Sequence, residues 1–166
     1  MAYTPSTPEL GIQPIAGTST VQNHPLGYEV TAYDPTFGGG EFIYLLGVTG
    51  TVVGSLVTYA PSTYQTALSP NTANQAQPVA VAMSANIGSQ YGWYQIEGQA
   101  VIKKTAVKVN PSVQLYQSAT TGRVMPTAAS GKQILGTRTA NAATVASATS
   151  TIQALINRPS MQGQTT

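Results

Sequence analysis

Glycine and proline interrupt this chain so often that no helical pattern of useful length survives between them. The 166 residues include 16 glycines and 11 prolines. Between them the apolar residues recur in short runs, many with the alternation typical of strands. Runs spaced by roughly 8–15 residues, with turn residues between them, predict an all-β fold. We expect a small β-barrel or sandwich of about eight short strands over residues 41–160, followed by a C-terminal tail, 161–166.

The predicted strands differ in strength. The clearest lie at 41–48, 52–59, 78–84, 91–103, 113–116, 133–137 and 152–156, with briefer ones at 66–68, 107–109 and 123–125. Pro159 is expected to stop the last, since proline cannot donate to a sheet ladder. Residues 61–77 and 139–150 are predicted loops, the second of them mobile. The residues expected in the core include Phe42, Tyr44, Val57, Val81, Ile96 and Leu135.

Residues 1–40 differ from the rest of the chain. They hold five prolines and end in Gly38-Gly39-Gly40. Closely spaced prolines exclude a long helix and are expected to break any sheet ladder, so we predict an extended arm with the three glycines as its hinge. Apolar residues along the arm need burial on another surface. The candidates for contact with a neighbouring copy or a partner are Leu10, Ile12, Ile15, Tyr28, Tyr33 and Phe37. An arm that wraps its own domain is the alternative.

The few charges of the chain are sorted by sign. Only 7% of the residues are charged; residues 1–97 carry −5 and residues 98–166 carry +7. A monomer normally intersperses its charges. The sorting suggests that the acidic part meets the basic part of a neighbouring copy, or that the chain meets a partner of complementary potential. Chance is the alternative with only twelve charges.

The residues needed for several kinds of chemistry are missing from the sequence. Without cysteine, and with His24 as its one histidine, the chain offers no thiolate site, triad or metal-ligand pair. We therefore expect no enzyme activity, no metal and no cofactor. The bases are scattered, which disfavours nucleic acid as a partner. No window reaches the roughly 20 apolar residues of a membrane span, and the first residues lack the pattern of a secretion signal.

One strand is rich in aromatic residues. In residues 91–98, period-2 alternation places Tyr91 and Trp93 on one face and Tyr94 and Ile96 on the other. At least one of these aromatic rings must therefore enter the core. We interpret the strand as core plus interface, with a stacking platform for a carbohydrate or nucleobase as the alternative.

Several segments together resemble one family of virus proteins. They are His24-Pro25-Leu26-Gly27, Gly40-Glu41-Phe42-Ile43-Tyr44-Leu45, Gly47-Val48, Gly54-Ser55-Leu56-Val57-Thr58-Tyr59, Tyr91-Gly92-Trp93-Tyr94-Gln95-Ile96-Glu97-Gly98, Gln133-Ile134-Leu135-Gly136 and Asn157-Arg158-Pro159. The pattern is similar to the capsid decoration, or cement, proteins of tailed bacteriophages. It covers roughly residues 24–160, and the strands around Phe42 and Trp93 are its most specific parts.

The resemblance implies a structural virion protein. Such a protein is made in the cytoplasm of the bacterial host, binds the outer surface of the capsid and stabilises the lattice of the major capsid protein. It also implies a small β-barrel or sandwich without enzymatic residues that associates with copies of itself as a dimer or trimer. The alternative function is a virion surface module that binds a host carbohydrate or receptor through Trp93 and nearby tyrosines.

Overall fold

The computed structural model describes residues 2–6 and 11–164 and contains only β-structure there, which confirms the all-β prediction. Every pairing between its strands is antiparallel. The strands are β1 (Thr4–Pro5), β2 (Thr18–Ser19), β3 (Glu29–Asp34), β4 (Gly38–Leu46), β5 (Leu56–Tyr59), β6 (Thr66–Leu68), β7 (Val79–Ala82), β8 (Tyr91–Lys103), β9 (Gln114–Gln117), β10 (Val124–Met125), β11 (Gln133–Thr139) and β12 (Thr151–Met161).

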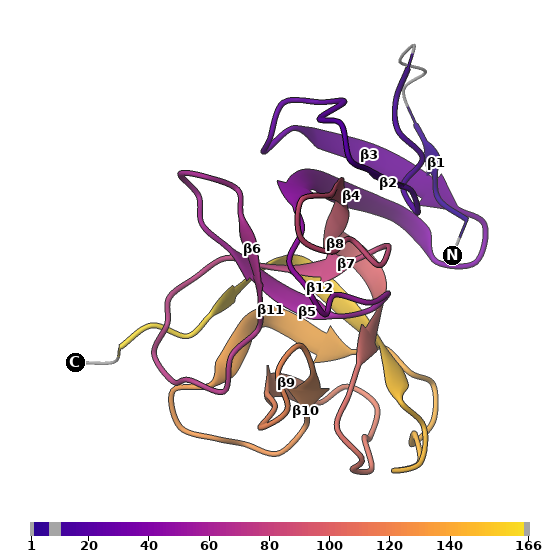
Figure 1. Ribbon diagram of the computed structural model, residues 1–166. Coiled ribbons are helices and arrows are strands. Elements are labelled where there is room, and N and C mark those ends of the chain that lie inside the picture. Colours follow the sequence, from indigo (N-terminus) through magenta and orange to yellow (C-terminus); the bar gives the residue numbers. More distant parts are fainter. Residues whose placement is uncertain (1, 7–10, 165–166) are drawn as a thin grey trace.

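The long strand β8 joins the whole molecule (Figure 1). The main sheet runs in the order β1-β3-β4-β8-β12-β11-β9-β10, while β2 and β7 also pair with β8, and β5 joins β7 to β6. Within the described residues this sheet does not close into a barrel. Strands β1 and β3 and the start of β4 form the upper right part of the view, and β9 and β10 lie at the opposite end.

The two faces of β8 pack into different clusters, as the alternation predicted. Trp93 packs with Phe42 and Tyr44 of β4 under the N-terminal segment. Tyr94 and Ile96 pack on the other face, against β5 and β7. Farther along the strand, Ala100 and Ile102 pack into the largest cluster, with β9, β11 and β12. The register with β4 shifts between Gln95 and Glu97, so the alternation of β8 reverses at this bulge.

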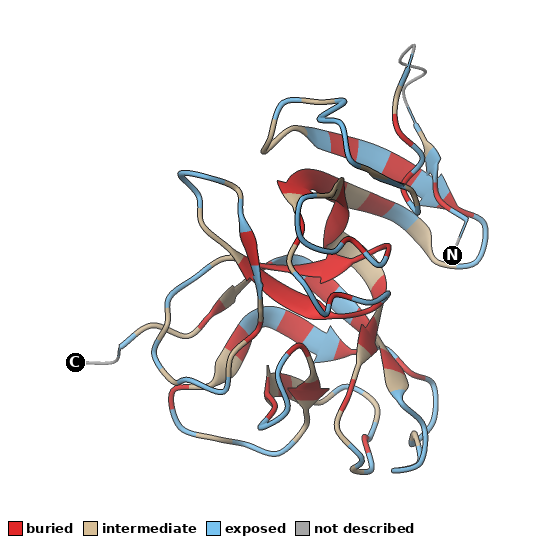
Figure 2. Cartoon of the chain, viewed as in Figure 1, coloured by how far each residue is buried: buried red, intermediate tan, exposed pale blue. Residues whose placement is uncertain are grey.

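Five of the six predicted core residues are buried, and Leu135 is not. Phe42, Tyr44, Val57, Val81 and Ile96 are at most 2% exposed, whereas Leu135 is 42% exposed. Its neighbour Ile134 takes the inward position on β11, so the alternation turns Leu135 to solvent. Figure 2 shows the alternation as red and pale-blue blocks along β3 and β11.

The last strand passes through Pro159, contrary to the prediction that it stops there. The register between β11 and β12 shifts between Leu135 and Thr137, which leaves a bulge on β12. Arg158 lies in this bulge with φ of 39°. A proline is tolerated in a bulge because no ladder bond needs its missing N–H group. The strand predicted at 107–109 is also wrong, since Val109 forms only an isolated bridge to Val145.

The N-terminal segment belongs to the sheet, which corrects two predictions. Its prolines do not keep it out of the sheet, because Pro25 and Pro35 flank β3, which pairs along its length with β4, and Pro5 lies in the short strand β1 opposite Ala32. The three glycines are not a hinge but the first residues of β4, paired with Ala32, Tyr33 and Asp34. A Cβ atom on Gly40 would lie 3.0 Å from the Glu97 carbonyl oxygen, so close approach of β4 and β8 requires glycine there.

Buried tyrosines make the fold sensitive to alkali. Burial is the main cause that raises the pKa of Tyr3, Tyr44, Tyr59 and Tyr94 above the ordinary value of 10.0. A raised folded-state pKa gives stability that is complete below pH 10.0 and is lost as the pH rises through the folded value. We expect the free energy of unfolding, measured in urea, to fall as the pH rises above about 10. Tyr94→Phe should reduce that fall, whereas Tyr33→Phe, at an exposed position, should leave it as in the wild type.

Candidate functional site

The N-terminal segment packs on its own chain. Ile15 is 2% exposed and clusters with Tyr44 and Trp93. Among the other predicted contact residues, Ile12, Tyr28 and Phe37 are partly buried against the same cluster, and Tyr33 is 58% exposed on the outer side of β3. Leu10 lies outside the described residues. The structure thus follows the alternative in which the arm wraps its own domain, and most of its apolar anchors are already occupied.

Gln13 holds the segment in place. Its backbone oxygen accepts a hydrogen bond from the indole Nε1 of Trp93 at 2.9 Å. Its side-chain Oε1 accepts from the Tyr44 hydroxyl at 2.9 Å and from Asn23 Nδ2 at 3.0 Å. Its Nε2 donates to the carbonyl oxygens of Gly17 and Tyr91. We call this set of hydrogen bonds around Gln13 the latch. Leaving buried donors or acceptors without partners is costly, so the latch fixes the segment against β4 and β8.

Trp93 cannot serve as an exposed stacking platform in this fold. Its side chain is completely buried, with Tyr44 at 5.0 Å and His24 at 5.3 Å between ring centroids. His24 belongs to the same latch, because its Nε2 accepts a hydrogen bond from the backbone N–H of Gln13 at 3.0 Å. Trp93 and Tyr94 are therefore core, which confirms the core part of the interpretation from the sequence.

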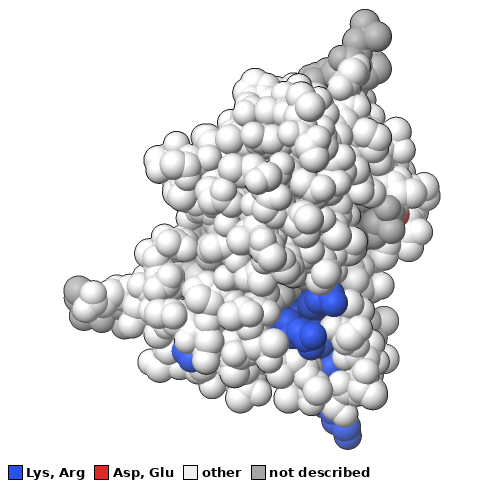
Figure 3. Space-filling model, in the orientation of Figure 1, with Lys and Arg blue, Asp and Glu red and all other residues white. Residues whose placement is uncertain are grey.

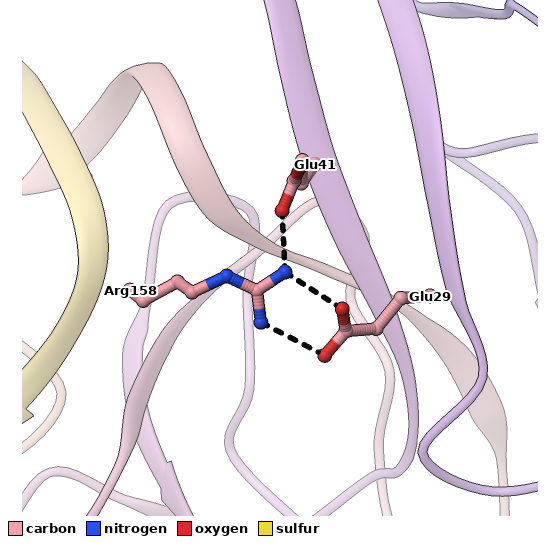
Figure 4. A network of polar contacts seen from close by, with 3 residues as sticks. All are labelled: Glu29, Glu41 and Arg158. Atoms are coloured by element: carbon pink, nitrogen blue, oxygen red, sulfur yellow. Dashed lines mark hydrogen bonds and ion pairs between the residues drawn. The ribbon is translucent and has the colours of Figure 1, made fainter.

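Arg158 connects the last strand to the N-terminal part of the sheet (Figure 4). Its guanidinium donates to Glu29 through two bonds of 3.1 and 2.8 Å and to Glu41 through one of 2.6 Å. The hydrogen bonds that Arg158 donates to Glu29 are the main cause that raises the pKa of Arg158, and the hydrogen bond to Glu41 adds to them. Two acids from the first part of the sequence thus meet a base from the last part within a single chain.

The remaining charges leave an excess of unpaired bases. Within residues 2–6 and 11–164, the ion pairs found are those of Arg158. Buried Asp34 accepts hydrogen bonds from the backbone N–H groups of Ala2, Thr36 and Phe37. Although burial opposes ionisation, these donors hold the pKa of Asp34 below its ordinary value. The bases on the surface without a carboxylate partner there are Lys103, Lys108, Arg123, Lys132 and Arg138.

Several basic side chains are visible on the face of the molecule drawn in Figure 3. In Figure 3 they lie in the lower half of the view, and almost no acidic atom shows on that face. Lys104 is the exception among the bases, because it is fully buried. Its Nζ donates to the carbonyl oxygens of Thr105, Val107 and Ser147, and burial lowers its pKa. Lys104 therefore holds the loops around it together, and it is not available to a partner.

One face of the sheet is partly exposed where β8, β12 and β11 lie side by side. On β12, Ile152, Ala154 and Ile156 enter the core, so Gln153 and Leu155 point the opposite way. Residues paired directly across antiparallel strands share a face. Leu155 pairs with Gln99 of β8 and Arg138 of β11, Gln153 pairs with Val101, and Thr151 pairs with Lys103. We call this surface the open face and define it as Gln99, Val101, Lys103, Arg138, Gln153 and Leu155.

The open face has two hollows and carries positive charge. A hollow of about 320 Å³ lies beside Arg138 and Leu155, and a second of about 310 Å³ lies beside Val101 and Gln153. Gln99 Nε2 donates a hydrogen bond to Gln153 Oε1, with 3.2 Å between the two atoms. None of these residues was among the contact sites predicted from the sequence. The alternation in 151–157 was the available signal, but it does not tell which strands lie beside β12.

Two functional alternatives find no site in the described part of the chain. No group of three or more His, Cys, Asp or Glu residues within 2–6 and 11–164 could hold a metal ion. In the same residues no helix has the length and apolar character to cross a membrane.

A scan against models of known protein families and a search of curated proteins both found no match to this chain.

Proposed function

We propose that this protein is a capsid decoration protein of a tailed bacteriophage. It binds the outer surface of the shell and stabilises the lattice of the major capsid protein, and its copies associate as dimers or trimers. The shell protein and other copies are its partners, and its place is the outer surface of the virion. It acts by binding, without catalysis.

The surplus of unpaired surface bases carries the proposal. Three of the five acids are engaged within the chain by Arg158 or by backbone N–H groups, whereas five surface bases have no carboxylate partner among the described residues. A one-signed surface of this kind favours association with a large acidic surface. The two strands that carry the most specific part of the resemblance, β4 and β8, also support it, since they lie side by side in the sheet.

The alternative, a glycan- or receptor-binding module built on Trp93, is not favoured. Stacking on a sugar needs an exposed ring, and Trp93 is buried beneath the N-terminal segment. We therefore do not propose it as a second function.

Binding to stripped shells tests the proposal. Purified protein is mixed with capsids of the phage that encodes it, prepared without the protein, and the capsids are sedimented. We expect saturable binding at a fixed ratio to the shell protein, weakened by salt because surface charges contribute. Capsids that already carry their full complement serve as the control and should take up little more. Absence of saturable binding to the stripped shells would refute the proposal.

A further inference from the structure

We propose that the open face is the surface that docks on the shell, and that its occupant is an extended segment of the shell protein with acidic and apolar side chains. This inference rests on the proposed function and adds to it the contact surface and the chemistry of the partner.

The N-terminal segment and the open face lie on opposite faces of β8. Trp93 and Gln95 lie beneath the segment, where the hydroxyl of Tyr3 contacts Gln95 Nε2 and reaches the carbonyl oxygen of Gln99 at 3.0 Å. The register with β4 shifts between Gln95 and Glu97, and this bulge reverses the alternation of side chains along β8. Gln99, Val101 and Lys103 therefore point away from the segment, which leaves their face partly exposed.

The open face offers apolar contacts in two places. Leu155 is 39% exposed beside the first hollow, and Val101 is half-buried beside the second. The hollows lie next to the successive outward residues Leu155 and Gln153 of one strand. In an extended partner segment, alternate residues point the same way, so two of its side chains have the same spacing as Leu155 and Gln153 and could enter the two hollows.

The charges of the open face select an acidic partner. Lys103 and Arg138 flank it, and neither forms an ion pair or a side-chain hydrogen bond with the described residues. None of the six residues of the open face is an acid, and the nearest acid on β8 is Glu97, two positions before Gln99. In a second copy Asp34, Glu29 and Glu41 are already engaged within their own chain, which leaves Glu97 among the described acids. Charge complementarity therefore favours the shell protein over a second copy as the occupant.

Cysteine footprinting tests the docking surface, and the chain suits this method because it contains no cysteine. Leu155→Cys places a thiol on the open face. Val53→Cys and Val21→Cys are matched controls at exposed apolar positions elsewhere, at 52% and 67% exposure. Each full-length variant is labelled with a maleimide alone and on stripped capsids. We expect labelling of Leu155→Cys to slow by about tenfold or more on capsids, because the core of an interface excludes water. At least one control should keep its rate.

Binding variants complete the test. Leu155→Asp places a negative charge beside the first hollow, where it would repel an acidic partner. It should weaken binding to capsids by about 30-fold or more. Arg138→Ala should weaken binding and reduce its dependence on salt, whereas Lys132→Ala, at a base outside the open face, should have a much smaller effect. Circular dichroism of each variant establishes that it is folded.

Each outcome decides between the hypotheses. If capsids bind the protein but Leu155→Cys labels at its free rate, the open face is not the docking surface. If Leu155→Cys is protected in the free protein at high concentration, and sedimentation shows an oligomer, the occupant is a second copy. Both results overturn the inference while leaving the proposed function standing. If the wild type does not bind stripped capsids, the proposed function fails, and this inference fails with it.

Discussion

Removal of residues 1–38 should leave a chain that does not fold stably. The deletion uncovers Phe42, Tyr44 and Trp93, all of them fully buried, and takes away the strand that pairs with β4. At about 1.5–3 kcal/mol for each large apolar side chain, the loss is about 4.5–9 kcal/mol, comparable to the whole stability of a typical domain. We expect low solubility and no cooperative unfolding transition in urea.

The matched control removes residues 164–166, which lie beyond the last strand. That chain should unfold with the wild-type midpoint. A soluble 39–166 chain that keeps a cooperative transition would show that β4 and β8 hold their shape without the N-terminal cover. It would also revive the sequence-based view of residues 1–40 as a separate arm.

Replacing Trp93 with alanine should destabilise the protein by about 3–5 kcal/mol, the usual cost of deleting a large buried aromatic side chain. The change removes the ring that contacts Tyr44 and His24 and also the indole N–H that binds the Gln13 carbonyl oxygen. The measurement is the free energy of unfolding in urea.

Two further variants separate the causes. Trp93→Phe keeps an aromatic ring but loses the hydrogen bond to Gln13, and it should cost about 1–3 kcal/mol because a buried acceptor loses its partner. Tyr33→Ala, at an exposed aromatic position, should change the stability by no more than about 0.5 kcal/mol. A loss below about 1 kcal/mol for Trp93→Ala, well under the cost expected for a buried aromatic, would mean that the segment is held by other contacts.

Local alternation explains why the strand predictions succeeded where they did. Residues 91–103 form β8 with the predicted bounds, and Trp93 and Tyr94 point to opposite faces, because the side-chain period of a strand is a property of the backbone itself. The alternation also holds at Leu135, but its phase was predicted wrongly, because its neighbour Ile134 takes the inward position. The prediction that the last strand stops at Pro159 failed for a different reason, since a bulge removed the need for a ladder hydrogen bond.

The interface candidates show the limit of reasoning from residue type. Ile12, Ile15, Tyr28 and Phe37 need burial, but an apolar side chain gains as much from its own domain as from a neighbour. The choice depends on whether the uncovered face of β4 and β8 lies within reach, which is a property of the assembled sheet. The sorted charges had the same ambiguity until Arg158 was found beside Glu29 and Glu41.

The all-β class and most strand positions could be predicted from the residue pattern, because they depend on backbone period and turn residues. The neighbours of each strand, and hence which surfaces are covered, follow from the way the whole sheet packs. Leu155, Arg138 and Val101 are far apart in the chain and share a surface only because β12 lies between β8 and β11. Long-range pairing of this kind arises from the packing of the whole sheet, and no local pattern encodes it.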